Sequence, residues 1–243
     1  MLLVWGAGLV EHPDDAPVPP PIVIGGGLLL LAAFVLIERR SPHPLIKWTE
    51  LRNAPFMRAN GTAFTNTFTT SASGTLIALV AQRQLGLDAW STGLILLPFS
   101  IMVVIGSTTG RFWLTKPATA GMAAGLAVVS ASMVALAVAT ASSSVPGLAI
   151  AIGVAGLGLS WAALTSTSTA MQSVPGERQG TASGAINTAA QIGTALGVAT
   201  LLTVSSVAGG DDERFGFTIA FVAAAILAAL YALTLLLTTK RTR

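Results

Sequence analysis

The stretch PATAGMAAGLAVVSASMVALAVATASSSVPGLAIAIGVAGLGLSWAALTSTSTAMQSVPG, residues 117–176, is 60 residues long and contains no charged side chain. A bilayer core about 30 Å thick is crossed by roughly 20 apolar residues of helix. The segment SSSVPG, residues 142–147, interrupts the stretch near its middle with residues that favour turns. The stretch therefore predicts two membrane-spanning helices joined by a short turn.

Five further stretches, each 22 to 32 residues long, also lack charged side chains. The sequence therefore predicts an all-α integral membrane protein with seven transmembrane helices. A soluble helical protein fits poorly, because 9% charged residues are too few to solvate the surface of a 243-residue chain. The crossings are expected at Ile22–Ile37, Asn60–Gln82, Ser91–Gly110, Pro117–Ala141, Pro146–Ala170, Gly180–Val207 and Phe215–Thr239.

The basic residues in the gaps between these runs predict an orientation. With the N-terminus outside, 11 of the 13 Lys and Arg residues lie in cytoplasmic gaps, and only Arg83 and Arg214 lie outside. Lys and Arg of short loops stay in the cytoplasm, whereas acidic residues contribute little to orientation. We therefore expect a multi-pass protein of the cell inner (plasma) membrane with a cytoplasmic C-terminus. The membrane explains the scattered basic residues better than a nucleic-acid partner does.

The gaps divide the chain into five parts. Residues 1–20 form an extracellular segment, whose apolar part Met1–Val10 is too short to span a bilayer. It is expected to be the remnant of a preceding helix, and the alternative is an interfacial segment with Trp5 at the headgroups. Residues 21–38 form a spacer helix, 39–58 a basic cytoplasmic linker, 59–239 a block of six helices, and 240–243 a cytoplasmic tail. Six helices in a block favour two groups of three, as in inverted repeats.

The composition argues against catalysis. The chain has no cysteine, and its two histidines, His12 and His43, both lie in gaps. Thiolate metal sites, cysteine nucleophiles and a Ser-His-Asp arrangement within the membrane therefore cannot form. We expect no enzymatic activity, no catalytic residue, no metal site and no bound cofactor.

Polar side chains inside two crossings are the candidate lining of a substrate cavity. Asn66 and Thr70 lie one turn apart in Asn60–Gln82, and Asn187 and Gln191 lie one turn apart in Gly180–Val207. An amide that faces lipid is poorly satisfied, so a cavity or a neighbouring helix must supply its partner. Trp161, well inside its crossing, could stack on an apolar substrate. For each of these residues, packing between helices is the alternative.

Other residues are predicted to shape the helices. Pro98 lies inside a crossing, where proline removes a backbone hydrogen bond and favours a kink. Gly184, Gly193 and Gly197 have spacings that allow close contact between helices. No Asp, Glu, Lys, Arg or His lies inside any expected crossing, although proton-coupled pumps use such groups as relays. Coupling chemistry is therefore expected to come from outside this chain.

Several stretches, in their order, resemble the major facilitator superfamily, and within it the fourteen-helix drug:proton antiporters. The link ERRSPHPLI (38–46) is similar to that group's entry into its second six-helix half. The stretch LGLDAWSTGL (85–94) with Leu97-Pro98, the decayed loop Gly106–Arg111, and GTASG (180–184) with QIGTALGVA (191–199) resemble later parts of the same half. The resemblance covers about residues 20–239.

The resemblance implies that the last six crossings are the C-terminal half of a multidrug-type efflux transporter. Its site would lie between two halves, lined by the helices that contain Asn66, Thr70, Trp161, Asn187 and Gln191, and its substrate would be small and amphipathic. Membrane lipid and a missing N-terminal half are the implied partners, and proton-motive force drives the full-length family. The half alone is not expected to transport. Self-association into a pseudo-complete transporter, or a non-transporting membrane protein, are the alternatives.

Overall fold

The structure is a computed structural model that describes residues 53–240. The expected crossing Ile22–Ile37, the segment 1–20, the linker up to residue 52 and residues 241–243 of the tail lie outside the described residues. The described residues therefore correspond to the expected block of six helices.

The described residues form six long helices and contain no strand, which confirms the all-α prediction. A π-helical turn, η2 (Val80–Gln84), extends the first helix, and short 3₁₀ helices, η3 (Gly110–Thr115) and η4 (Gly176–Arg178), lie in two of the links. The six helices are α4 (Ala54–Leu79), α5 (Ala89–Thr109), α6 (Ala118–Ala141), α7 (Val145–Gln172), α8 (Gln179–Gly209) and α9 (Glu213–Lys240).

Five of these helices, α5 to α9, are long and apolar enough to cross a membrane by length and composition. The sixth, α4, is 26 residues long but rich in Thr, Ser and Asn. It begins at Ala54, inside the segment that was expected to be linker. Pro55 in its first turn has no backbone N–H to leave unpaired, and Phe56 is buried, so the helix is anchored before the charged Arg58.

Local chemistry explains where the helices begin. Ser143 adopts a left-handed backbone (φ 53°), and Ser144 accepts a hydrogen bond from the Gly147 N–H as the N-cap of α7. The triple serine therefore makes the expected turn between α6 and α7. Asp88 caps α5 by accepting from Ser91 N at 3.0 Å, and hydrogen bonds from Ser91 lower the pKa of its carboxyl.

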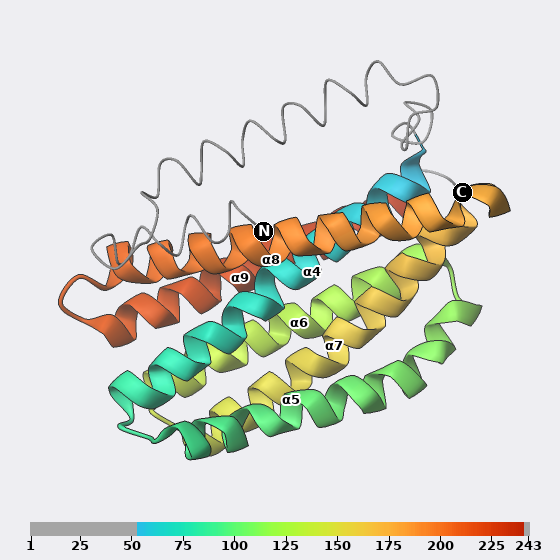
Figure 1. The fold of residues 1–243 in the computed structure, drawn as a ribbon. Coiled ribbons are helices and arrows are strands. Elements are labelled where there is room, and N and C mark those ends of the chain that lie inside the picture. Colours follow the sequence, from blue (N-terminus) through green and yellow to red (C-terminus); the bar gives the residue numbers. More distant parts are fainter. Residues whose placement is uncertain (1–52, 241–243) are drawn as a thin grey trace, which may run out of the picture. The chain divides into compact units, whose positions relative to one another are not determined.

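Successive helices run in opposite directions, and α4 and α7 are central (Figure 1). The helix α4 packs against α8, whereas α7 packs against α5, and α6 packs against both α7 and α9. The first helix of each group of three thus packs on the second helix of the other group. This exchange is the arrangement that a 3+3 inverted repeat produces.

Glycines bring these helix pairs together. A methyl group at Gly193 or Gly197 of α8 would overlap the backbone carbonyls of Phe64 and Phe68 in α4. Across the α5–α7 pair, a methyl group at Gly156 would likewise overlap the Phe99 carbonyl. Backbone contact at this range is how small residues stabilise helix association in membranes, where apolar side chains gain nothing over lipid.

The two ends of the bundle differ in charge. We call one end the basic end: within the described residues it contains Arg58, Arg111, Lys116, Arg178 and Lys240, with Glu177 as its acid. The opposite, acidic end contains Asp88, Asp211, Asp212 and Glu213 together with Arg83 and Arg214. There Arg83 and Glu213 approach to 3.8 Å, which links the start of the α4–α5 connection to the start of α9. The bundle thus keeps its charges at its ends, as bilayer burial of the helices requires.

Replacing Gly197 by Ala is expected to destabilise the bundle by about 1–3 kcal/mol, because the added methyl group must push α8 away from α4. Gly184→Ala is the matched control on the same helix, since no atom lies within 4 Å of its added methyl group. Its effect should stay below about 1 kcal/mol, the range of helix propensity alone. Denaturant-induced unfolding in mixed micelles measures both. Equal losses for the two variants would contradict the packing described here.

Candidate functional site

The polar face of α4 is buried among the neighbouring helices. Asn66 is 1% exposed, and its Nδ2 donates to the backbone carbonyl of Leu159 in α7 at 3.0 Å. Its Oδ1 is buried and has no hydrogen-bond partner among the described residues. The amide therefore joins the two central helices and leaves one acceptor unused.

Other polar side chains of α4 connect it to α8. Thr67 Oγ1 donates to the Ala190 carbonyl at 2.6 Å, and Ser71 Oγ lies 3.1 Å from Thr194 Oγ1. These two bonds alternate with the close glycine contacts along the same helix pair. Together they fix the rotation of α8 about its own axis, and hence which of its residues face away from α4.

Thr70 is also buried, but its partner is its own helix. Its Oγ1 donates to the Asn66 carbonyl at 2.7 Å, the back-bonding that hydroxyl side chains use inside apolar helices. Thr69 and Ser73 make equivalent bonds. Within the described bundle, Thr70 therefore faces no open space.

Trp161 of α7 lies between α5 and η3. Its ring centroid is 5.5 Å from that of Trp113, and its Nε1 donates to Thr109 Oγ1 at 3.0 Å. The side chain is half-buried. Its surroundings are therefore aromatic and apolar, with one hydroxyl to satisfy the indole.

Asn187 and Gln191 are placed differently, since both are exposed on α8. No hydrogen bond joins either amide to another of the described residues. Thr188 and Gly184 are exposed on the same stretch of the helix. An uncovered pair of amides, one turn apart on a helix of membrane-spanning length, would be poorly satisfied by lipid chains and is suited to water or to a polar partner.

The structure therefore divides the five candidate residues into three groups. Asn66 and Thr70 lie together at the buried contact of α4 with α7, Trp161 lies at the contact of α7 with α5, and Asn187 and Gln191 lie on the open face of α8. None of the described contacts joins the exposed amides to the other three residues. A shared cavity, if these residues line one, must be completed by something outside the described bundle.

The residues expected to shape helices are found in α5 and α8. Pro98 lies inside α5 and faces Gly153 of α7. Gly193 and Gly197 are buried against α4, whereas Gly184 is exposed with open space where its side chain would be. The two edge helices, α5 and α8, leave much apolar surface uncovered, at Leu94, Leu97, Ile101 and Val104 of α5 and at Ile192, Leu196 and Val207 of α8.

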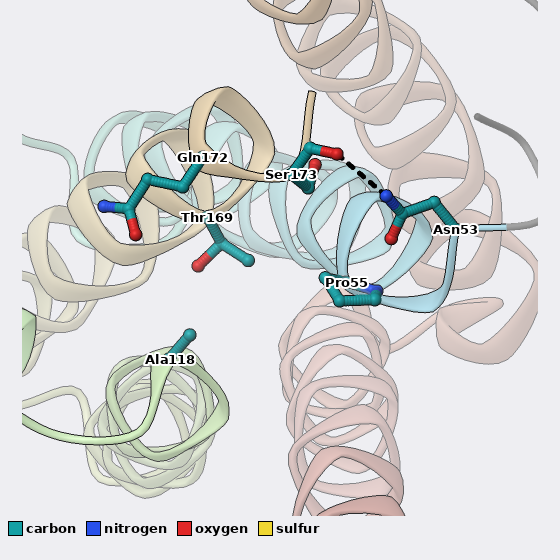
Figure 2. Close-up of a pocket in the computed structure, with 6 residues that line it drawn as sticks. All are labelled: Asn53, Pro55, Ala118, Thr169, Gln172 and Ser173. Atoms are coloured by element: carbon teal, nitrogen blue, oxygen red, sulfur yellow. Dashed lines mark hydrogen bonds between the residues drawn. The ribbon is translucent and has the colours of Figure 1, made fainter. Parts of the chain in front are cut away.

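A shallow recess of about 240 Å³ lies at the basic end, between the starts of α4 and α6 and the end of α7 (Figure 2). Its lining is neutral, and Asn53 Nδ2 already donates to the Ser173 carbonyl at 2.8 Å across it. The lining contains none of the five candidate residues and consists of Asn53, Pro55, Ala118, Thr169, Gln172 and Ser173.

Some contacts that define the site were not anticipated from the sequence. Thr67 and Ser160 both donate to carbonyls of neighbouring helices, Ser160 to Val103 of α5 at 2.9 Å. Thr109 and Trp113 complete the surroundings of Trp161. The sequence does show hydroxyl side chains close to glycine-rich stretches. It does not show which neighbouring helix each hydroxyl contacts.

The described residues contain no group of three or more His, Cys, Asp or Glu side chains that could hold a metal ion. No ionisable side chain lies in the interior of α4 to α8, where apolar, amide and hydroxyl groups provide the chemistry. Such a surface can bind neutral or amphipathic molecules by apolar contact and a few directed hydrogen bonds.

Comparison with known proteins assigns this architecture. The family model of the Major Facilitator Superfamily matches residues 3–198. The chain is 32% identical over 176 residues to the multidrug resistance protein Stp of Mycobacterium tuberculosis, a match that covers 70% of this chain and 32% of Stp. It is 28% identical over 173 residues to the quinolone resistance protein NorB of Staphylococcus aureus, covering 68% of this chain and 36% of NorB.

The matches thus span about a third of the length of these two relatives. The helix order, the exchanged packing of two groups of three helices and the family match agree with one another. The chain is a multi-pass membrane protein and belongs to the Major Facilitator Superfamily.

Proposed function

We propose that this chain is the C-terminal half of a multidrug-type efflux transporter and lines a substrate cavity together with an N-terminal half. The observation that supports this most is the open face of α8, where Asn187 and Gln191 are exposed and have no hydrogen-bond partner among the described residues. Lipid would leave these amides unsatisfied, whereas a facing half and a water-filled cavity would not. The names of the relatives, which are resistance proteins, support the same class of function.

The two edge helices support a second half as the missing neighbour. Both α5 and α8 are packed on one side only, α5 against α7 and α8 mainly against α4 and α9. In this superfamily two six-helix units rock about a site at their interface. The faces of α5 and α8 that point away from the bundle are the surfaces that we assign to this contact.

In this proposal the candidate residues have separate roles. Asn187 and Gln191 would contact the substrate directly, because they are exposed. Asn66 would hold α4 to α7 through the Leu159 carbonyl and offer its free Oδ1 when the two helices move apart. Trp161 would contribute an apolar wall beside Trp113.

We also propose that the basic end lies in the cytoplasm. Within the described residues, five residues at this end are Lys or Arg, namely Arg58, Arg111, Lys116, Arg178 and Lys240, and one is an acid. Short loops that are rich in Lys and Arg stay on the cytoplasmic side. Since Arg58, near the start of α4, is the one ionisable residue of α4 to α8, proton coupling would be supplied by the other half, and this half alone would not transport.

Co-expression with the N-terminal half of Stp or NorB tests the proposed function. Cells that contain both halves should accumulate less of a fluorescent amphipathic dye than cells that contain either half alone. Replacing both Asn187 and Gln191 by Ala should slow efflux about tenfold, since two directed hydrogen bonds of roughly 0.5–1.5 kcal/mol each are lost. Gln172→Ala, which removes an exposed amide at the basic end, is the matched control and should leave efflux unchanged.

Two results would count against the proposal. The first is no efflux from the combined halves in cells where the full-length relative is active. The second is an efflux rate that does not change when both exposed amides are removed. That result would favour the alternative of a membrane protein with only a structural or binding role.

The role assigned to Asn66 is tested by stability. Asn66→Ala should destabilise the bundle by about 1 kcal/mol, because it removes a buried hydrogen bond between two helices. Gln191→Ala should change stability by less than about 0.5 kcal/mol, because its side chain is exposed and unpaired among the described residues. Unfolding of the purified chain in mixed micelles compares them. If Gln191→Ala is the more damaging substitution, the assignment of buried and open faces is wrong.

A further inference from the structure

The segment that ends α5 has a composition unlike the rest of the bundle. At Gly110 the α-helix tightens into η3, which runs to Thr115 and is followed by Lys116 in an extended conformation. Arg111 is the first charged residue after the apolar run of α5, so η3 lies where the membrane-spanning part of the helix gives way to water. Three large apolar residues, Phe112, Trp113 and Leu114, occur at this boundary.

These three side chains do not all pack inward. Trp113 is half-buried against Trp161 of α7. Phe112 and Leu114, on either side of it, are 59% and 48% exposed. Exposing these two side chains to water would be unfavourable. The boundary between headgroups and acyl chains instead suits both an aromatic ring and its polar neighbours.

The two cations of the segment are exposed and stand beside these apolar groups. Lys116 Nζ lies 5.1 Å from the centroid of the Phe112 ring, which is the distance of a cation–π contact. Arg111 precedes the same ring in sequence and is also exposed. No acidic residue occurs between Asp88 and Glu177, so no carboxylate of α5, η3, α6 or α7 neutralises this pair.

We propose that Arg111, Phe112, Leu114 and Lys116 form a binding site for the headgroup of an anionic phospholipid. The cations would contact the phosphate and the negatively charged headgroup, and Phe112 and Leu114 would contact the upper acyl chains. Charge complementarity selects this occupant: a zwitterionic headgroup offers no net charge to two cations that form no ion pair with a carboxylate of residues 53–240, and a soluble acidic partner would leave the apolar pair in water. The site would tether the α5–α6 connection to one leaflet, and it does not depend on the proposed transport function.

Tryptophan quenching by brominated lipid tests this site in the full chain. With Trp5, Trp48 and Trp90 replaced by Phe, the fluorescence reports from Trp113 and Trp161. In bilayers with equal mole fractions of brominated lipid, brominated phosphatidylglycerol should quench more strongly than brominated phosphatidylcholine. Removing both cations with Arg111→Gln and Lys116→Gln should lower the relative binding constant about fivefold for each cation, as expected for basic side chains near an anionic surface.

The matched control removes two exposed cations at the opposite end, with Arg83→Gln and Arg214→Gln. It makes the same change in net charge and should keep the preference for phosphatidylglycerol. Circular dichroism checks that both double variants retain the helix content of the parent. Equal quenching by the two lipids in the parent, a preference that survives loss of Arg111 and Lys116, or an equal reduction in both double variants would overturn the site.

Discussion

The bilayer leaves this chain no way to place an unpaired charge or an open backbone group inside it, and the rest of the structure depends on that constraint. The uncharged runs become helices because only a helix satisfies every backbone group within one segment. The charges then collect at the two ends of the described bundle, and their unequal distribution distinguishes a basic end from an acidic end. The fold follows from this segregation, and so do the orientation and the lipid contact that we propose.

Within the membrane the constraint acts on neutral polar groups as well. The hydroxyls of α4 bond to carbonyls of their own helix or of α8, and Asn66 bonds to the Leu159 carbonyl of α7. The amides of Asn187 and Gln191 on α8 have no such partner among the described residues. Pairing of two six-helix units, as in this family, offers a physical reason for the difference. Polar groups that are hydrogen-bonded within one unit hold that unit together. Polar groups without such a partner are available to a facing unit or to a substrate.

The sequence predicts the helices of residues 53–240 well because uncharged runs report directly on burial in lipid. The turn at Ser142–Ser144 lies where its residue types indicate, and the helices α6 and α7 start within one residue of Pro117 and Pro146. The start of α4 at Ala54 differs from expectation, since a Pro in the first turn and a buried Phe56 extend the helix past a charged residue. The site is less predictable: Asn66 and Gln191 look alike in sequence, and only tertiary packing shows that one is buried and the other open.

The segregation of charge makes a direct claim about which end of the bundle faces the cytoplasm. The chain contains no cysteine, so a single introduced thiol reports its own location. Thr115→Cys at the basic end and Ser142→Cys in the α6–α7 turn are both exposed positions, at opposite ends of α6. A membrane-impermeant maleimide on intact cells should label the thiol at position 142 and should reach the one at position 115 only after permeabilisation. The reverse pattern would contradict the proposed orientation and the charge argument behind it.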